Sequence, residues 1–352
     1  PSALYKLGNI FEKGDYVEGD IKTAIQYYEQ ASKLGNSKAM CKLGSIYENG
    51  QHIPINIDKA IHYYEDASKL NNAYAQFNLG MIYYDKKYNK FDIQKAIQFL
   101  NLAAKNNHTN AQYVLGTIYE RSDYIANDIY KAIAYYKRAA DEGNHRNSQN
   151  NLGKIYYNGI GGISRNVNEA LKYFQLAAKN KCPNAIYHLG KIYEEGKHGI
   201  SKNITKALDC FKQAAKLNEN NAQYHLGKIY KEGTYNLYNI NLAIDFLTRS
   251  ANQNNKEAQY QLGRLYELGK QVELDIHKAI NYYKSAADNG HILARFYLGS
   301  IYFEGRYVDC DYEKALYYFR EASTGNTWAK NNFAVIYKTG KGIKADLSKS
   351  TV

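Results

Sequence analysis

The sequence predicts an all-α fold, an α-α superhelix (solenoid) of about nine and a half tandem helix-turn-helix repeats of 36–37 residues. Three observations support this prediction. The dipeptide Leu-Gly recurs at a fixed spacing, two different helical patterns alternate between its copies, and turn residues separate the two patterns. Self-similarity at such a period is typical of arrays in which each repeat is one supersecondary unit that stacks on its neighbours.

The repeat length follows from the glycine of each Leu-Gly pair. Successive glycines are 36 or 37 residues apart, at Gly8, Gly44, Gly80, Gly116, Gly153, Gly190, Gly227, Gly263 and Gly299. A tenth copy is degenerate, with Phe333-Ala334 in place of Leu-Gly, and Asp346 to Lys349 would start its second helix. We therefore expect residues 1–352 to form a single array of nine full repeats plus the first helix of a tenth. Since the chain opens at Pro1 inside a repeat, we expect a fragment of a longer protein.

The first helix of each repeat carries one apolar stripe. Counted from the glycine, alanine occupies position −5 (with Ser148 the single exception), leucine −1, isoleucine or leucine +2, and an aromatic residue +3. These offsets fall on one face of an α-helix. The glycine has no side chain and lets the neighbouring helix approach closely. The helix is expected to end at a glycine at position +6, namely Gly14, Gly50, Gly159, Gly196, Gly233, Gly269, Gly305 and Gly340.

The second helix opens at an Asp or Asn whose side chain can accept hydrogen bonds from free N–H groups of the first turn. Nine residues occupy this capping place: Asp20, Asn56, Asp92, Asp128, Asn166, Asn203, Asn239, Asp275 and Asp311. The helix then reads Lys-Ala-Ile-x-Tyr-Tyr-x-x-Ala-Ala, as in residues 278–287, and its small alanines allow close packing. A left-handed residue is expected after it, at Gly35, Asn71, Asn107, Gly143, Asn218, Asn254, Gly290 and Gly325.

The motif Ala-x-x-x-Leu-Gly-x-x-Tyr-x-x-Gly, followed by Asp-x-x-Lys-Ala-x-x-Tyr-Tyr-x-x-Ala-Ala-x-x-Gly, resembles the Sel-1-like repeat family, a relative of the tetratricopeptide repeats. The resemblance covers essentially the whole chain. Tetratricopeptide repeats themselves fit less well, because their period is 34 residues and they lack a Gly-x-Gly-like loop such as Gly159 to Gly161. The resemblance implies a scaffold or adaptor for protein complexes, with no ligand that all members share.

The charge of the chain is basic but dispersed. Lys and Arg number 46 against 34 Asp and Glu, which gives a formal net charge of +12, and no block of five like charges occurs. Such an excess admits an acidic protein or peptide partner. Nucleic-acid binders concentrate their basic residues, so nucleic-acid binding is only a weak alternative. No run of 18 apolar residues exists, and no membrane span is expected.

The cysteines and histidines predict neither disulfides nor metal sites. Cys41, Cys182, Cys210 and Cys310 fall at four different phases of the repeat, whereas a disulfide ladder would use a recurring phase. We expect free thiols and a reducing compartment, which favours the cytoplasm. His188 and His225 share position −2 in adjacent repeats, about 10 Å apart by ordinary helix packing, and are expected at the surface. No cofactor is predicted.

The ligand-binding hypothesis concerns the side of the first helices opposite the apolar stripe, which lines the concave face of a two-helix solenoid. Position −3 is largely aromatic there, and position +1 is cationic in four successive repeats. Together they would form a groove with an aromatic floor and a basic row, suited to an extended acidic peptide. Its residues are Tyr113, Lys154, Tyr187, Lys191, Tyr224, Lys228, Tyr260, Arg264 and Phe296.

A purely structural role for these residues is the alternative. The tyrosines would then pack on the adjacent first helix, and the lysines would lie along apolar surface with their charges in water. Glu120, Glu194 and Glu267, at position +4, would neutralise part of the basic row. The pair Glu194-Glu195 is expected on a solvated helix face.

The predicted function is a protein–protein interaction scaffold that binds a peptide or protein partner on the concave face. An enzyme is not expected, since no nucleophile elbow, Cys/His pair or phosphate loop is evident. The main alternative is a regulatory repeat segment of a larger enzyme or ubiquitin-ligase complex. Neither end of the chain offers a polar capping helix, so exposed apolar surface and end-to-end self-association are also expected.

Overall fold

The computed structural model describes residues 1–14, 18–50, 53–305 and 307–340, and these ranges contain helices but no strand. The first helices of the repeats, which we call A helices, are α1 (Ser2–Lys13), α3 (Ser37–Asn49), α5 (Ala73–Tyr84), α7 (Thr109–Arg121), α9 (Arg146–Asn158), α11 (Pro183–Glu195), α13 (Asn220–Glu232), α15 (Lys256–Leu268), α17 (Ile292–Glu304) and α19 (Thr327–Thr339). The B helices are α2 (Ile21–Lys33), α4 (Ile57–Lys69), α6 (Ile93–Lys105), α8 (Ile129–Asp141), α10 (Val167–Lys179), α12 (Ile204–Lys216), α14 (Ile240–Ala251), α16 (Ile276–Asp288) and α18 (Tyr312–Ala322). Two short 3-10 turns are η1 (Lys86–Tyr88) and η2 (Thr234–Asn236).

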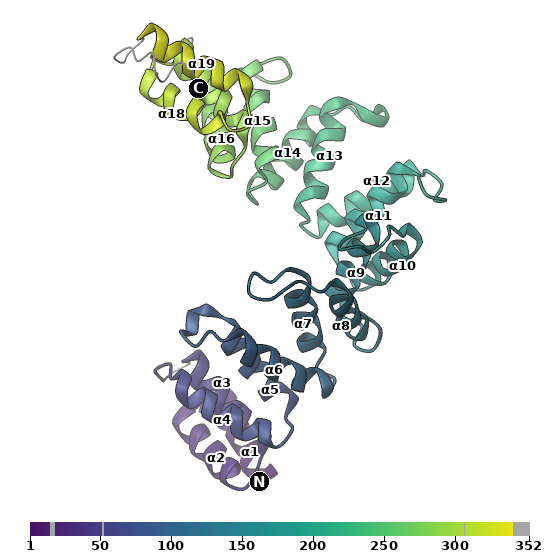
Figure 1. Ribbon diagram of the computed structural model, residues 1–352, viewed down its shortest axis with the longest axis vertical. Coiled ribbons are helices and arrows are strands. Elements are labelled where there is room, and N and C mark those ends of the chain that lie inside the picture. Colours follow the sequence, from purple (N-terminus) through teal and green to yellow (C-terminus); the bar gives the residue numbers. More distant parts are fainter. Residues whose placement is uncertain (15–17, 51–52, 306, 341–352) are drawn as a thin grey trace. The chain divides into compact units, whose positions relative to one another are not determined.

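Consecutive helices pack against one another from α1 to α10 and from α12 to α19 (Figure 1). The chain groups into two compact units, Pro1–Ala185 and Ile186–Val352. The predicted all-α solenoid of tandem helix pairs is thereby confirmed. The single array over residues 1–352 stays a prediction, and the expected start of a tenth B helix at Asp346 to Lys349 lies outside the described residues.

The capping residues predicted for the B helices are confirmed at all nine positions. Each side chain accepts a hydrogen bond from a backbone N–H of the first turn, as Asp275 does from Lys278 at 2.9 Å. The glycines at +6 end the A helices in the left-handed region, as Gly269 does with φ 61°. Glycine adopts this conformation without the steric strain that a Cβ causes.

Two predictions of a left-handed residue after a B helix are wrong. Gly143 and Gly325 do not have a positive φ, and in the fourth repeat Asn144 takes the left-handed conformation instead, with φ 48°. Both glycines serve a close approach to the start of the A helix of their own repeat. An added Cβ would lie 2.4 Å from a methyl carbon of Thr109 at Gly143, and 2.6 Å from Cδ1 of Ile292 at Gly325.

The core forms where the apolar stripe of each A helix meets the following B helix. In the eighth repeat, Ala258 and Leu262 are fully buried, and the B helix comes so close that a Cβ on Gly263 would lie 2.6 Å from Tyr283 Cδ1. We call the residue that contacts the central glycine, 20 or 21 positions after it, the anchor residue. The nine anchors are fully buried: Tyr28, Tyr64, Leu100, Tyr136, Phe174, Phe211, Leu247, Tyr283 and Phe319.

A second layer of rings covers the outer edge of this core. The aromatic residue at +3 stacks on a ring of the B helix, as Tyr119 does on Tyr135, with centroids 5.8 Å apart and planes 3° from parallel. The lysine of the Lys-Ala pair lies over the same ring, and Lys131 Nζ is 5.3 Å from the centre of Tyr119. Cation–π contacts of this kind are individually weak, but here they recur from repeat to repeat.

Candidate binding surface

The residues of the predicted groove lie on A helices of both units. Tyr113 and Lys154 belong to the first unit, on α7 and α9, and the others lie on α11, α13, α15 and α17 of the second unit. Within each unit, we call the surface formed by positions −3, −2, +1, +4 and +5 of its A helices the A-helix face of that unit. Within the second unit, this face presents Lys228 and Arg264 at the same position of two successive A helices.

The aromatic residues at −3 are partly core residues. Four of them lie 5.8 to 6.1 Å, between ring centroids, from the anchor ring of their own repeat: Tyr113 from Tyr136, Tyr187 from Phe211, Tyr260 from Tyr283 and Phe296 from Phe319. Tyr224, whose anchor is Leu247, packs half-buried against the same kind of cluster. Burial raises the pKa of Tyr260 to about 12, and the nearby Tyr297 adds to this shift. One edge of each ring is therefore fixed in the core, which leaves the other edge for the surface.

Three of the −3 rings also contact the histidine that caps the next A helix. The ring centroids are 4.5 Å apart for Phe77 and His108, 4.7 Å for Tyr113 and His145, and 4.3 Å for Tyr260 and His291. Each histidine is the N-cap of an A helix, and its Nδ1 accepts a backbone N–H three residues further on. Burial lowers the pKa of all three imidazoles. The repeat motifs did not predict these caps, although asparagine fills the same place at Asn36, Asn72 and Asn255.

A glutamate at +4 holds the anchor ring from the A-helix face. Wherever the anchor is a tyrosine, its hydroxyl donates to that glutamate at 2.5 to 2.9 Å: Tyr28 to Glu12, Tyr64 to Glu48, Tyr136 to Glu120 and Tyr283 to Glu267. Where the anchor has no hydroxyl, the residue at +4 varies, and the five residues are Tyr84, Tyr157, Glu194, Lys231 and Phe303. The glutamates that face a tyrosine anchor are therefore structural in the first instance.

Three of the four cations at +1 have neighbours of opposite charge on their own helices. Lys191 Nζ lies 2.7 Å from a carboxylate oxygen of Glu194, and Arg264 Nη1 lies 2.7 Å from one of Glu267. Lys228 is more exposed and lies 4.0 Å from Glu232, while Lys154 is half-buried on α9. Exposed pairs of this kind contribute little to stability, about 0–1 kcal/mol, so Lys228 stays available to a partner.

Glu194 is the +4 glutamate whose anchor, Phe211, has no hydroxyl to donate. Its carboxylate instead accepts from Lys191 Nζ at 2.7 Å, His225 Nε2 at 2.9 Å and the Tyr235 hydroxyl at 3.0 Å. Burial acts to raise the pKa of Glu194, but the hydrogen bonds from His225 and Lys191 outweigh it and bring the pKa to about 2. The expectations of a surface His225 and a solvated Glu194 are wrong, because their side chains are 19% and 14% exposed.

Two neighbouring cavities open on the A-helix face of the second unit. One, of about 180 Å³, is lined by Lys231, Gln261, Arg264, Leu265, Leu268, Lys270 and Gln271. The other, of about 390 Å³, is lined by Glu267, Leu268, Phe296, Tyr297, Ser300, Ile301, Glu304 and Tyr307. The two cavities share Leu268. Of the residues predicted for the groove, Arg264 lines the first cavity and Phe296 the second.

Nine consecutive segments of the chain match the family model described as Sel1 repeat: residues 1–36, 37–72, 73–108, 109–144, 146–182, 183–219, 220–255, 256–291 and 292–326. The chain belongs to the Sel1 repeat family. The resemblance seen in the motifs is confirmed, and the matched segments have the period of the Leu-Gly pairs. Sel1 repeat folds are generally protein-interaction scaffolds and generally non-enzymatic.

Two solved structures are similar to this Sel1 repeat protein over most of their length. A protective antigen present in uropathogenic Escherichia coli strains, which displays an SLR fold, is 29% identical, with a TM-score of 0.74 over 99% of this chain and 74% of that chain. A Sel1 repeat protein from Oxalobacter formigenes is 26% identical, with a TM-score of 0.71 over 87% of this chain and 88% of that chain. A search of curated proteins finds no match.

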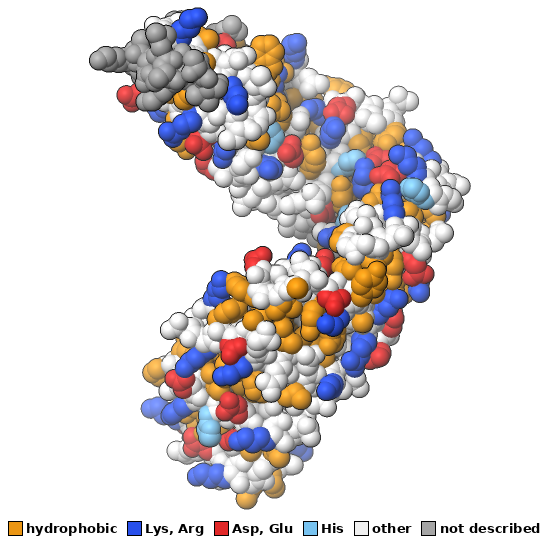
Figure 2. All heavy atoms as spheres, viewed as in Figure 1, with side chains coloured by type: hydrophobic (Ala, Val, Ile, Leu, Met, Phe, Trp, Pro, Cys, Tyr) orange, Lys and Arg blue, Asp and Glu red, His pale blue; other side chains and the backbone are white. Residues whose placement is uncertain are grey.

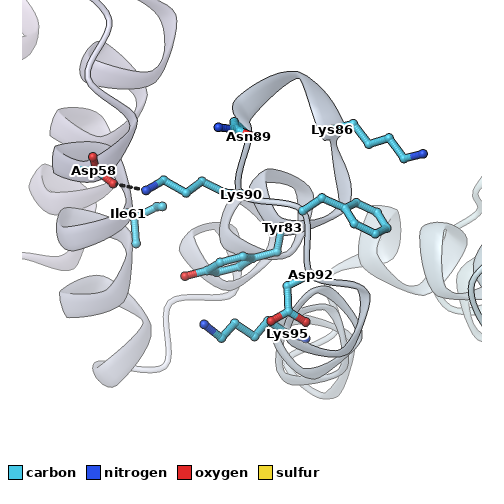
Figure 3. Close-up of a pocket in the computed structure, with 9 residues that line it drawn as sticks. Asp58, Ile61, Tyr83, Lys86, Asn89, Lys90, Asp92 and Lys95 are labelled. Carbon is cyan, nitrogen blue, oxygen red and sulfur yellow. Dashed lines mark hydrogen bonds and ion pairs between the residues drawn. The ribbon is translucent and has the colours of Figure 1, made fainter.

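The first unit of the Sel1 repeats has a cavity of about 690 Å³ beside η1, where α4, α5 and α6 come together (Figure 3). Figure 3 shows Lys90 reaching across to Asp58 of α4, and the two side chains pair at 2.6 Å. Asp92 caps α6, and Lys95 Nζ lies 5.2 Å from the ring centre of Tyr83. The charges at this cavity are therefore engaged with their own neighbours, which makes it a weaker candidate than the A-helix face of the second unit.

Within the described ranges, no three His, Cys, Asp or Glu side chains are placed so that they could hold a metal ion. All four cysteines are free thiols, and burial raises the pKa of Cys41 to about 12. Among the helices described, none has both the length and the apolar composition that crossing a bilayer requires. Figure 2 shows acidic and basic side chains interspersed over the visible surface, as their dispersal in the sequence predicts.

Proposed function

We propose that this Sel1 repeat protein acts by binding, as an adaptor that holds a peptide or protein partner along the A-helix face of its second unit. The observation that carries the proposal is the pair of adjoining cavities on α13, α15 and α17. Binding sites are typically concave, with apolar walls and a few polar groups that set orientation. The leucines, rings and charged groups that line these two cavities match that description.

The side chains at this site are held in place before any partner arrives. Tyr297 stacks on Tyr283, with centroids 5.8 Å apart and planes 9° from parallel, and Arg264 Cζ lies 4.3 Å from the centre of the Tyr297 ring. Arg264 is further fixed by Glu267. Groups that are already ordered lose less conformational entropy on binding. The face therefore offers aromatic and guanidinium groups in fixed positions, which favours a specific partner.

Photo-crosslinking tests where the partner binds. The photoreactive residue p-benzoylphenylalanine would be placed at Ser300, which lines the larger cavity, and at Lys228 on α13. Asp245 is the matched control, because its side chain is 58% exposed on α14, the B helix of the same repeat as Lys228. After affinity capture from cell extract, we expect the same discrete adduct from positions 300 and 228 and none from position 245.

Two results would contradict the proposal. An adduct that forms as readily from position 245 would place the partner on the B helices. A captured partner that is nuclease-sensitive, and whose affinity falls steeply with salt, would favour nucleic acid instead.

A further inference from the structure

We propose that the 180 Å³ cavity between α13 and α15 is a carboxylate-binding subsite, which takes a glutamate side chain of the partner. This inference rests on the proposed function and names the chemistry of the partner residue at one point of the A-helix face. It is carried by Lys231, which occupies position +4 of the seventh repeat and lines the cavity together with Arg264 and Lys270.

Lys231 is a half-buried cation that has no counter-ion among the residues that the structure describes. Its ammonium donates a hydrogen bond to the amide oxygen of Gln261. The adjacent Glu232 lies 4.0 Å from Lys228 instead. Burial lowers the pKa of Lys231; Glu232 opposes this shift, while the positive charges of Lys228 and Arg264 add to it. A cation removed from water and placed near other cations is stabilised by an anion.

Lys231 is not needed for packing in the way that its counterparts are. In four other repeats the residue at +4 is a glutamate that accepts the hydroxyl of a tyrosine anchor. The anchor of the seventh repeat is Leu247, which has no polar group to satisfy and is fully buried without one. A lysine at this place therefore contributes a charge to the cavity and nothing to the anchor.

The remaining walls fit a carboxylate on a short apolar stem. Arg264 gives one N–H of its guanidinium to Glu267, and a guanidinium has five. Lys270 is exposed at the mouth, and Gln261 and Gln271 add carboxamide groups. Leu265 and Leu268 line the rest of the cavity and give apolar contact for methylene groups. Glutamate has both parts, a carboxylate for Lys231 and Arg264 and two methylenes for the leucines, whereas a free phosphate has no stem.

The test measures binding of fluorescein-labelled hexaglutamate by fluorescence anisotropy, with labelled hexaglutamine as the neutral counterpart. Lys231→Met removes the cavity charge but keeps the length of the side chain. Lys284→Met is the matched control, because it removes one positive charge from an exposed position on α16, the B helix of the same repeat as Arg264, and does not line the cavity. We expect hexaglutamate to bind and hexaglutamine not to. Lys231→Met should weaken binding about tenfold or more, and Lys284→Met less than about twofold.

Lys270→Met is a second variant that should not disturb folding, since Lys270 is exposed past the end of α15. It should weaken hexaglutamate binding about threefold, because salt partly screens an exposed charge. Circular dichroism checks that each variant is folded. Equal losses from Lys231→Met and Lys284→Met would overturn the subsite and show attraction by dispersed charge. Displacement of hexaglutamate by potassium phosphate, but not by potassium acetate at equal ionic strength, would overturn the choice of a carboxylate.

The two proposals can fail separately. If the crosslinks from positions 228 and 300 form but Lys231→Met does not weaken hexaglutamate binding, the adaptor proposal is supported and the subsite is overturned. If hexaglutamate binds through Lys231 but every partner crosslinks from position 245, the subsite stands and the proposed partner surface is wrong.

Discussion

The ring of Tyr283 lies directly against the backbone of Gly263, so that a Cβ on the glycine would be 2.6 Å from Tyr283 Cδ1. The same tyrosine donates its hydroxyl to Glu267 at 2.5 Å, one turn further along α15. The two contacts together set the distance between α15 and α16 and hold the ring in one orientation. The same arrangement recurs in the three other repeats with a tyrosine anchor.

Gly263→Ala is expected to lower the free energy of unfolding by about 1–3 kcal/mol, the usual cost of an overpacked core. The added methyl must displace a ring that is fully buried and hydrogen-bonded. Urea denaturation followed by circular dichroism measures the change.

A double-mutant cycle provides the control for this prediction. Tyr283→Ala alone should cost about 3–5 kcal/mol, as ring removal from a core does, and the double variant should cost clearly less than the sum, since the clash disappears with the ring. Strict additivity would show that the glycine is needed for another reason.

The histidine caps predict that stability depends on pH. Burial holds the pKa of His108, His145 and His291 below the ordinary value of 6.5, although Glu257 opposes the shift for His291. The unfolded chain therefore binds more protons than the folded chain near neutral pH. The stabilisation is fully present above about pH 6.5 and is lost as the pH falls through the lower folded-state pKa values. Melting temperatures measured between about pH 7.5 and about pH 5 should fall accordingly.

The triple substitution of these histidines by asparagine is the matched control, since asparagine caps α3, α5 and α15. Asparagine does not titrate, so the variant should show a smaller fall over the same pH interval. Each lost cap costs about 1 kcal/mol. A variant with an unchanged pH profile would assign the effect to other groups.

Glu194→Gln should destabilise the sixth and seventh repeats. The substitution removes the negative charge that accepts hydrogen bonds from Lys191, His225 and Tyr235. A hydrogen bond to a charged group contributes about 1.5–3 kcal/mol to stability. We expect a loss of at least about 1.5 kcal/mol by urea denaturation. Glu232→Gln, in an exposed pair at 4.0 Å, is the control and should cost less than about 0.5 kcal/mol. Similar losses from both would contradict the special position of Glu194.

End-to-end self-association, expected from the sequence, is retained as a proposal. Trp328 on α19 is 72% exposed, and Leu7 on α1 and Val335 on α19 are partly exposed as well. Static light scattering should show a mass that rises with concentration, and Trp328→Ser should reduce that rise. Tyr130→Ser is the control, because Tyr130 is 67% exposed on α8, which is neither the first nor the last helix described. A constant monomer mass for the unaltered protein would rule the association out.

The elements of the fold could be predicted because their determinants are local. The Leu-Gly period gives the repeat, Asp275 and its equivalents begin the B helices, and Gly269 and its equivalents end the A helices through backbone geometry within a few residues. The two errors, at Gly143 and Gly325, have one cause. A glycine after a helix can serve a left-handed turn or a close approach, and the sequence does not distinguish the two uses.

The candidate binding surface was less predictable because its contacts join different repeats. Glu194 meets His225 and Tyr235, which are 31 and 41 residues away, and no motif within one repeat shows this. The histidine caps lie at a position where other repeats have asparagine, so a search for one recurring residue passes over them. The sequence does carry one signal: glutamate at +4 accompanies tyrosine at +20 in the same four repeats. That correlation is enough to indicate the hydroxyl–carboxylate pair from the residue pattern alone.

The hydroxyl of the anchor residue also bears on how such an array diversifies. Each tyrosine anchor donates its hydroxyl to a glutamate at +4 of the facing A helix. A phenylalanine or leucine anchor has no hydroxyl, so the residue at +4 need not be an acceptor. Exchange of tyrosine for phenylalanine removes one interior oxygen atom, and exchange for leucine also replaces the ring. In both cases position +4 no longer accepts a hydroxyl, as with Glu194 opposite Phe211 in the sixth repeat and Lys231 in the seventh. Copies of one template can thus acquire individual surface chemistry through substitutions in their interior.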